Sequence, residues 1–340
     1  MLGMLSVLGC VELRRSNAFA LTSTQPTSFS VSPGSAPPFH AMGRYGTAEG
    51  DSALFGFIGD AKLSSDGSVL VVEPNEHRVV RVSAEGKVIR VYGAKGAGPG
   101  ELLAPYRLAV RGAELSVYDR TLGRIVVFDT AGPFLRSQSA GAAMLLGDIV
   151  PVARSSYVVT GPVGSQIGPL GILDSSGVVR AVKGISRPSP ELALPGGGEP
   201  GRLCGRSDGS VIYFNPWTYE LVAIDPTTAA VRWSRRFESE EVVSVPFGAD
   251  PKRQAQKIAP LGIACTSSRI WVAYMTLDRR QVNYDELSSD GRALRRRVYK
   301  TAEDVSYPGF LSDARTGRLL TFRNRPWSFL VLYGVPEEGR

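Results

Sequence analysis

Residues 60–92, DAKLSSDGSVLVVEPNEHRVVRVSAEGKVIRVY, show a pattern of four short strands separated by three turns. The first and third turns are Ser65-Asp66-Gly67 and Ala84-Glu85-Gly86, and the middle one is Pro74-Asn75-Glu76. Asp-Gly between two apolar runs is the strongest short-range signal for a hairpin. A strand-rich unit of this size cannot bury both of its faces alone, so we expect several such units to pack face to face.

The unit repeats along the chain. Glycine turns of this kind recur at Gly86, Gly132 and Gly177, which are 46 and 45 residues apart. Ser-Asp-Gly-Ser-Val occurs at residues 65–69 and again at 207–211, 142 residues later and close to three periods. Four-stranded units with a period of roughly 47 residues are typical of the blades of a β-propeller.

Six segments are expected to begin the innermost strand of a blade, and their first residues are Asp60, Arg107, Asp148, Arg202, Gly262 and Gly309. We therefore predict an all-β, six-bladed β-propeller over residues 39–335, with about 50 residues for each blade. The last unit lacks an outer strand, and residues 42–46 resemble the outer strand of the first unit. We expect this N-terminal strand to pair in the last blade and close the ring, which leaves no open sheet edge between the first and last units.

Long loops are expected between the later blades, at residues 184–201 and 238–260. The second loop is predicted to contain a short helix, with Asp250 as its N-cap and Pro251 in its first turn.

Residues 71–82, VVEPNEHRVVRV, resemble the NHL repeat, in which a strand and an acidic residue are followed by a turn, Asn-His-Arg and an alternating strand. Residues 118–129, YDRTLGRIVVFD, are similar but lack the Asn-His pair. The glycine-rich connector at residues 93–101 is typical of bacterial six-bladed propellers related to that family. The resemblance covers about residues 40–136 and implies a propeller that binds a ligand or a protein through loops on one face.

Residues 1–38 are expected to lie outside the propeller, and residues 336–340 to form a short tail. Val7-Leu8-Gly9-Cys10 resembles a bacterial lipobox, whose cysteine is lipidated after cleavage, and Ala18-Phe19-Ala20 is an alternative cleavage site. Residues 21–38 are rich in Ser, Thr and Pro, which favours a tether. We predict a protein of the cell envelope or extracellular space whose membrane contact is a lipid on Cys10; a cytoplasmic protein with an irregular N-terminus is the alternative.

The composition restricts the functions that remain. The 340 residues carry 39 basic and 32 acidic side chains, for a net charge of +7, and 43% of them are hydrophobic, as in a folded globular protein. No run of about 18 uncharged apolar residues is present that would cross a membrane as a helix. The densest basic run, residues 292–297, is predicted to be an exposed strand edge, with a phosphate-binding stripe as the alternative. Nucleic acid is therefore not a favoured partner.

Few residues are available for metal or catalytic chemistry. Three cysteines and two histidines, without a Cys-x-x-Cys pair, exclude a zinc finger, and we expect no metal and no cofactor. Cys204 and Cys265 are expected to be buried free thiols; a disulfide between them is the alternative if their strands are adjacent. Residues 205–209 match Gly-x-Ser-x-Gly, but a strand follows them where a hydrolase has a helix, so we expect no catalytic serine.

Two sets of residues are the candidate binding sites. The inner-strand heads Asp60, Arg107, Asp148 and Arg202 should encircle one mouth of the channel, either as mutual salt bridges or as a site at which the arginines bind a small anion. Loops between the second and third strands carry polar and aromatic side chains suited to a protein interface: Tyr118, Arg120, Asn215, Trp217, Arg323 and Trp327. The alternative is that Trp217 and Trp327 pack between blades.

Three classes of function remain. We favour a non-catalytic propeller that binds an unknown protein or a small anionic ligand through its face loops and channel mouth. The alternative is a propeller enzyme of the lactonase or lyase kind with a divalent cation in the channel, and the third is a nucleic-acid-binding NHL-type domain. Fold alone does not decide among them.

Overall fold

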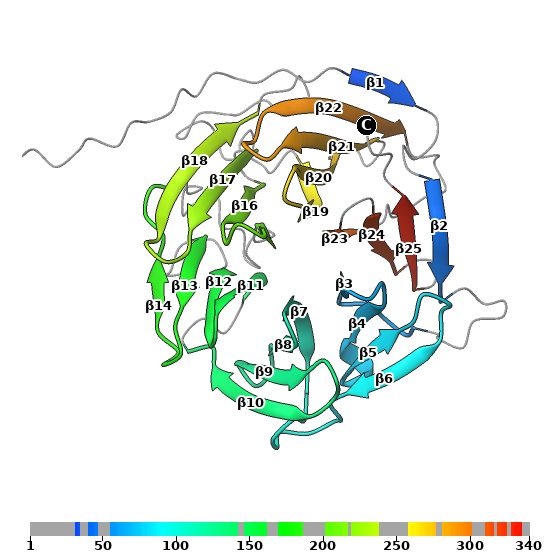
Figure 1. Cartoon of the computed structure of the whole chain (residues 1–340), viewed down its shortest axis with the longest axis vertical. Coiled ribbons are helices and arrows are strands. Elements are labelled where there is room, and N and C mark those ends of the chain that lie inside the picture. Colours follow the sequence, from blue (N-terminus) through cyan, green and yellow to red (C-terminus); the bar gives the residue numbers. More distant parts are fainter. Residues whose placement is uncertain are drawn as a thin grey trace, which may run out of the picture.

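The computed structural model is a ring of six β-sheets around a central axis (Figure 1). It describes residues 31–34, 40–46, 55–141, 146–161, 169–185, 201–216, 219–237, 258–276, 281–300, 310–315, 318–324 and 328–334. Within these ranges the chain forms strands and one short 3-10 helix, η1 (Pro74–Glu76). The all-β, six-bladed propeller predicted from the repeat is therefore confirmed.

The first three blades are four-stranded antiparallel meanders, in which each strand pairs with the next along the chain. Their strands run from the axis outward: β3 (Asp60–Leu63), β4 (Val69–Glu73), β5 (Arg78–Val82) and β6 (Val88–Tyr92); β7 (Pro105–Arg111), β8 (Glu114–Asp119), β9 (Arg124–Asp129) and β10 (Phe134–Ser139); and β11 (Asp148–Ala153), β12 (Ser156–Thr160), β13 (Leu170–Leu173) and β14 (Val179–Ala181).

The remaining blades follow the same plan with two additions from the N-terminal part of the chain. The strands are β15 (Arg202–Gly205), β16 (Val211–Asn215), β17 (Glu220–Asp225) and β18 (Ala230–Arg236); β19 (Ile258–Cys265), β20 (Arg269–Thr276), β21 (Gln281–Ser288) and β22 (Ala293–Lys300); and β23 (Phe310–Arg315), β24 (Arg318–Arg323) and β25 (Phe329–Gly334).

The two N-terminal strands add to the outer edges of the last two blades (Figure 1). Strand β2 (His40–Tyr45) pairs antiparallel with β25, so the sixth sheet has the order β2-β25-β24-β23. Strand β1 (Val31–Gly34) pairs parallel with β22 and makes the fifth sheet five-stranded. Part of the expected tether thus contributes a strand, because the outer edge of β22 offers unpaired backbone groups.

The repeated Ser-Asp-Gly-Ser turn has the same hydrogen bonds in both copies. Asp66 Oδ1 accepts hydrogen bonds from the Ser68 amide at 3.1 Å and from its hydroxyl at 2.7 Å. Asp208 accepts the corresponding bonds from Ser210, at 2.9 and 2.5 Å. In the first copy Gly67, between Asp66 and Ser68, has a φ of +86°, a conformation that favours glycine. The Gly-x-Ser-x-Gly match at residues 205–209 therefore lies at a hairpin between β15 and β16.

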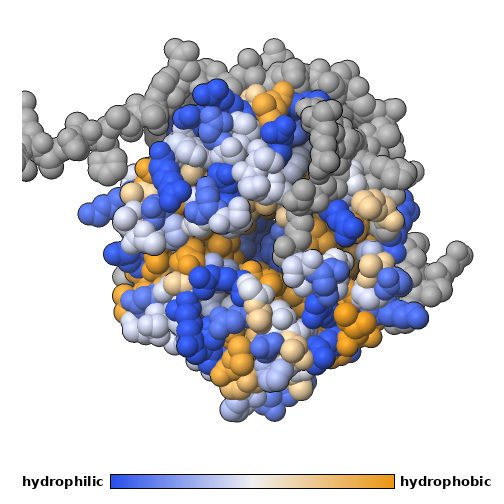
Figure 2. Space-filling model, viewed as in Figure 1, coloured by the Kyte–Doolittle hydropathy of each residue, from blue (hydrophilic) through white to orange (hydrophobic). Residues whose placement is uncertain are grey.

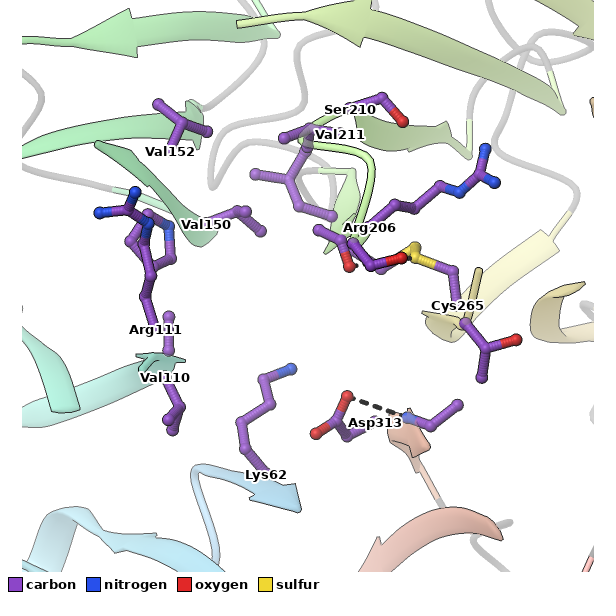
Figure 3. A pocket seen from close by; sticks show the side chains of 18 of the residues that line it. Lys62, Val110, Arg111, Val150, Val152, Arg206, Ser210, Val211, Cys265 and Asp313 are labelled. Carbon is purple, nitrogen blue, oxygen red and sulfur yellow. Dashed lines mark hydrogen bonds between the residues drawn. A yellow bond between two sulfur atoms is a disulfide. The ribbon is translucent and has the colours of Figure 1, made fainter. Parts of the chain in front are cut away.

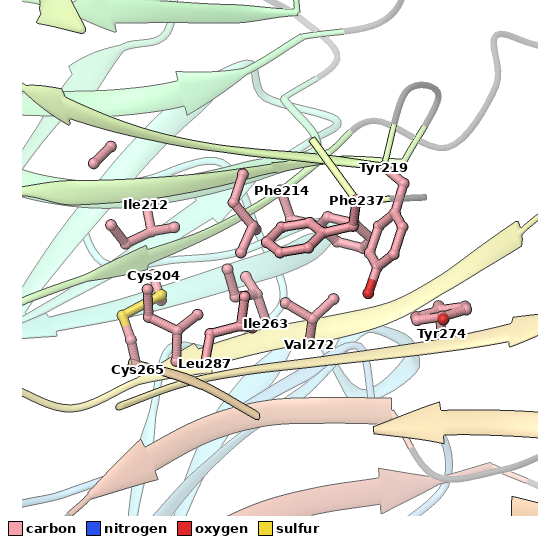
Figure 4. Packing of buried hydrophobic residues seen from close by; sticks show 13 residues of the cluster. Cys204, Ile212, Phe214, Tyr219, Phe237, Ile263, Cys265, Val272, Tyr274 and Leu287 are labelled. Atoms are coloured by element: carbon pink, nitrogen blue, oxygen red, sulfur yellow. A yellow bond between two sulfur atoms is a disulfide. The ribbon is translucent and has the colours of Figure 1, made fainter. Parts of the chain in front are cut away.

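The core lies between neighbouring blades, because each sheet is covered on both faces. All five residues of β4 are buried, and they alternate in direction: Val71 packs toward the sixth blade and Val72 toward the second. Between the fourth and fifth blades the core is rich in aromatic rings, with Tyr219 against Phe237 and Tyr274 (Figure 4). Strands that are buried on both faces read as nearly continuous apolar runs.

The prediction of free thiols at Cys204 and Cys265 is wrong. The two cysteines form a disulfide that joins β15 of the fourth blade to β19 of the fifth, with their Cα atoms 5.9 Å apart (Figure 4). Their strands are the innermost strands of adjacent blades, and adjacent strands were the condition stated for a disulfide in the sequence analysis. The helix predicted at Asp250 and the cysteine at residue 10 lie outside the described residues.

The basic run at residues 292–297 is only partly a solvated edge. Arg296 points inward from β22 and is buried, and its guanidinium makes a two-pronged ion pair with the buried Asp285, at 2.7 and 2.8 Å. The ring of Tyr274 lies 5.7 Å from the Arg296 guanidinium carbon. Burial raises the pKa of the Asp285 carboxyl to about 6, although Arg296 opposes that shift.

Candidate functional site

The inner strands of the six blades surround a central channel, which is visible as a hollow in the space-filling view (Figure 2). Two cavities lie along it. The smaller one, of about 240 Å³, is at the end where the inner strands begin, and the larger one, of about 660 Å³, is at the end where they lead into the next strand. Lys62 and Ser312 line both cavities, so the two meet at the middle of the channel.

The smaller cavity, called here the mouth cavity, brings together the charged heads predicted from the sequence. Asp60, Arg107, Asp148, Arg202 and Gly262 all line it. The sixth head, Gly309, lies outside the described residues. Three of the charged side chains, those of Asp60, Arg107 and Asp148, are almost fully buried.

The carboxylates of the channel hold the backbones of neighbouring blades. Asp60, Asp148 and Asp313 each accept one amide hydrogen bond on Oδ2 from the inner strand of the next blade. The donors are the amides of Leu108, Leu203 and Leu63, at 3.1, 2.8 and 2.8 Å. Each Oδ1 accepts the amide of the residue that follows its own aspartate, at 2.9 Å in all three cases. These carboxylates therefore join the first blade to the second, the third to the fourth, and the sixth to the first.

Arg107 acts in the same way with the opposite charge. Its Nη1 donates to the carbonyl of Gly59 at 2.7 Å, and its Nε donates to the carbonyl of Gly147 at 2.8 Å. These glycines precede the inner strands of the first and third blades, so one guanidinium connects three blades. The guanidinium also stacks over the Tyr106 ring, 4.1 Å from its centroid. Arg202 donates to the same Gly147 carbonyl at 3.4 Å.

The two interfaces not joined by these groups have other connections. The disulfide joins the fourth and fifth blades. Between the fifth and sixth blades the backbone of Gly262 approaches that of Leu311 so closely that a Cβ on Gly262 would lie 1.8 Å from the Leu311 carbonyl oxygen. Gly262 also has a φ of +136°, which an L side chain rarely adopts. The inner ends of all six blades are thus fixed to their neighbours.

Lys62 is a channel-lining residue that the sequence analysis did not identify. Its ammonium donates to the Ser312 carbonyl at 2.7 Å and lies 3.9 Å from Asp60 Oδ1. Burial lowers the pKa of this ammonium, but the nearby carboxylates of Asp60, Asp148 and Asp313 raise it above its ordinary value. Lys62 is therefore a permanent cation at neutral pH. Its position two residues after Asp60, on the same inner strand, was the available signal.

The metal-ligating side chains of the channel can be compared only among the described residues. Among the described residues, no three His, Cys, Asp or Glu side chains are grouped closely enough to hold a metal ion. The mouth cavity carries cations beside its carboxylates, and these would oppose the charge of a bound Ca²⁺. No helix in the described part of the chain is long and apolar enough to span a membrane.

The second set of candidate residues does not form a single exposed face. Tyr118 and Asn215 are fully buried, and the Tyr118 hydroxyl accepts a hydrogen bond from the Leu146 amide. Arg120 is exposed, with its guanidinium 5.2 Å from the Tyr106 ring centroid, and Arg323 ends strand β24. Trp217 and Trp327 lie outside the described residues, so an interface built on them stays a prediction.

Comparisons with solved structures support the fold. The chain is similar to a protein of Bacteroides fragilis that is predicted to be exported, with a TM-score of 0.62 and 11% identity over 87% of this chain and 95% of that one. It is also similar to a member of the DUF4221 family from Bacteroides vulgatus (TM-score 0.58, 10% identity, 87% and 97% coverage). A calcium-binding protein, regucalcin, from Agrobacterium tumefaciens gives a TM-score of 0.50 at 14% identity over 89% and 96% of the chains. No family model and no curated protein matches the sequence. At these identities the likeness concerns the fold alone.

Proposed function

We propose that this protein is a non-catalytic binding propeller of the cell envelope that holds a small anionic ligand in the mouth cavity. The observation that carries the proposal is the charge balance of that cavity, where the described lining residues include three cations, Lys62, Arg107 and Arg202, and two carboxylates, Asp60 and Asp148. These described lining residues carry one net positive charge, and both carboxylates already accept amide hydrogen bonds. Guanidinium and ammonium groups in a partly desolvated site bind carboxylates and phosphates through charge-assisted hydrogen bonds.

The shape of the cavity supports a small ligand. Its volume of about 240 Å³ lies just below the range of pockets that hold drug-sized molecules. Phe57, Tyr106 and Phe322 add aromatic surface to the lining, and Asn324 adds an amide. Such a site fits an anion with a short organic body. Inorganic phosphate and acetate are the simplest probes of its charge preference.

The Cys204–Cys265 disulfide supports a location in the cell envelope. Structural disulfides form and persist in oxidising compartments, and Cys204–Cys265 is a buried bond between two blades. The predicted export of the Bacteroides fragilis protein of the same fold points the same way. Lipidation of Cys10 would anchor the protein on the outer side of a membrane.

Strand β2 is proposed to close the ring. Tyr45, at the end of β2, is buried in the core that the sixth blade shares with the first. Its hydroxyl donates to the Ala84 carbonyl of the first blade at 3.0 Å. A single residue of β2 thus connects the last blade to the first, in addition to the ladder with β25.

The experiment is thermal unfolding of the full chain in the presence of phosphate or acetate. A ligand that binds only the folded state raises the melting temperature in proportion to the logarithm of its concentration once the site is saturated. The stabilisation should be lost in Arg202→Gln and kept in Arg90→Gln, which removes an equal charge from the exposed outer strand β6. Equal stabilisation of both variants, or none of the wild type by either anion, would refute the proposal.

A further inference from the structure

The larger cavity, called here the exit cavity, lies at the opposite end of the channel, among the turns that lead from each inner strand to the second strand (Figure 3). Its volume of about 660 Å³ lies within the range of pockets that hold organic ligands. The exit cavity is distinct from the mouth cavity, since the two share only Lys62 and Ser312 among their lining residues.

One wall of the exit cavity is apolar. Figure 3 shows Val110, Val150 and Val152 along one side. Pro151, Leu203 and Val211 extend this surface. Val110, Val150 and Val152 remain partly exposed, although most valines of the strands are buried. Apolar side chains that line an open cavity gain free energy when an apolar ligand covers them.

The charged groups of the exit cavity favour an anion. Lys62 extends into the cavity from its floor, and Arg111 lies on the same side as the valines (Figure 3). The Arg206 guanidinium contributes less, because it donates to the carbonyls of Ser289 and Ser267, at 2.8 and 2.7 Å, and lies 3.7 Å from the carboxylate of Asp208. Among the described lining residues the one carboxylate is Asp313, and it already accepts two amide hydrogen bonds.

Lys62 is placed to meet the charged end of a ligand. In the described part of the chain its ammonium donates one hydrogen bond, to Ser312, and an ammonium has three hydrogens to donate. Because its side chain is largely buried, a bond from Lys62 to an anion is screened less than a surface ion pair would be.

We propose that the exit cavity is a second binding site, which takes an amphipathic carboxylate: a single anionic head at Lys62 with an aliphatic body along the valine wall. This site goes beyond the small-anion site of the mouth cavity, because its specificity depends on the apolar body of the ligand. A ligand that carries charge alone gains little from the valine wall, and an uncharged aliphatic ligand gains little from Lys62.

The test is calorimetric titration of the oxidised full chain with butanoate, hexanoate and octanoate. Affinity should rise by about fourfold for each methylene that becomes buried. Octanol, which has the same body without the charge, should bind at least about tenfold more weakly than octanoate. An affinity independent of chain length, or equal for octanol and octanoate, would overturn the proposal.

Three variants locate the site. Val150→Asp places a negative charge on the valine wall and should weaken octanoate binding by about tenfold or more. Arg111→Gln, at an exposed residue, should weaken it by a smaller factor. Val178→Asp, at an exposed valine just before the outer strand β14, is the matched control and should bind as the wild type does. Equal affinity of the Val150→Asp and Val178→Asp variants would overturn the assignment.

Arg202→Gln separates the two sites. It should abolish stabilisation by phosphate at the mouth cavity and leave octanoate binding unchanged, because Arg202 does not line the exit cavity. Octanoate binding that persists when no small anion binds would leave the exit site intact and refute only the mouth site. Loss of octanoate binding in Arg202→Gln would instead overturn the exit site.

Discussion

Removal of the Cys204–Cys265 disulfide is expected to lower the free energy of unfolding by about 4 kcal/mol. The two cysteines are 61 residues apart, so the bond closes a long loop in the unfolded chain. In the loop-entropy description, stabilisation grows with the logarithm of the loop length, and a loop of this size corresponds to about 4 kcal/mol at 25 °C. Alanine is the suitable replacement because both side chains are buried and alanine introduces no polar group.

The assay is equilibrium unfolding in guanidinium chloride, followed by circular dichroism, of the wild type and the Cys204→Ala, Cys265→Ala double variant. Wild type with dithiothreitol should unfold at the midpoint of the double variant, whereas Cys10→Ser should match the oxidised wild type. Thiol titration of the unfolded wild type under non-reducing conditions should find a single thiol if Cys10 is unmodified. A difference below about 1 kcal/mol between the double variant and the oxidised wild type would refute the reasoning.

Three further predictions follow from the packing. Gly262→Ala should lower the free energy of unfolding by about 3 kcal/mol or more in the same assay, because the new Cβ would meet the Leu311 carbonyl. Gly112→Ala, at a positive φ with open space around it, should lower the free energy of unfolding by only about 1 kcal/mol. The pKa of the Asp285 carboxyl is about 6 in the folded state, above the ordinary 3.8. The stability that the protonated carboxyl contributes is therefore fully present below pH 3.8 and is lost as the pH rises to about 6. Urea unfolding should show this pH dependence in the wild type and not in Asp285→Asn. Deletion of residues 1–50 should lower the melting temperature because it removes β2, whereas deletion of residues 1–30 should leave it unchanged.

The fold was predictable because its signals are local. Each hairpin turn carries its own residues, as Ser65-Asp66-Gly67 and Ser207-Asp208-Gly209 show, and the period follows from their spacing. The heads of the inner strands could be placed at one mouth for the same reason, since each begins an equivalent strand. Asp60 and Arg107 indeed line one cavity although they are 47 residues apart in the sequence.

The interactions between blades were less predictable, because they depend on how far one inner strand is shifted along the axis relative to the next. The sequence indicates that Asp60 and Arg107 are neighbours, but it does not say that Asp60 accepts the Leu108 amide or that Arg107 reaches two carbonyls. The disulfide depends on the same shift. Tyr118 was expected on a loop because it lies near a turn, but the strand continues through Asp119 and buries it.

The most direct test of the central claim, that the mouth cavity binds anions and not a metal ion, is a pair of calorimetric titrations on one preparation of wild-type protein. Phosphate is titrated into the first sample and calcium chloride into the second, after dialysis against a chelator and then against a buffer without either ion. The account predicts saturable binding of phosphate and no saturable binding of calcium. Stoichiometric calcium binding without any binding of phosphate would contradict it.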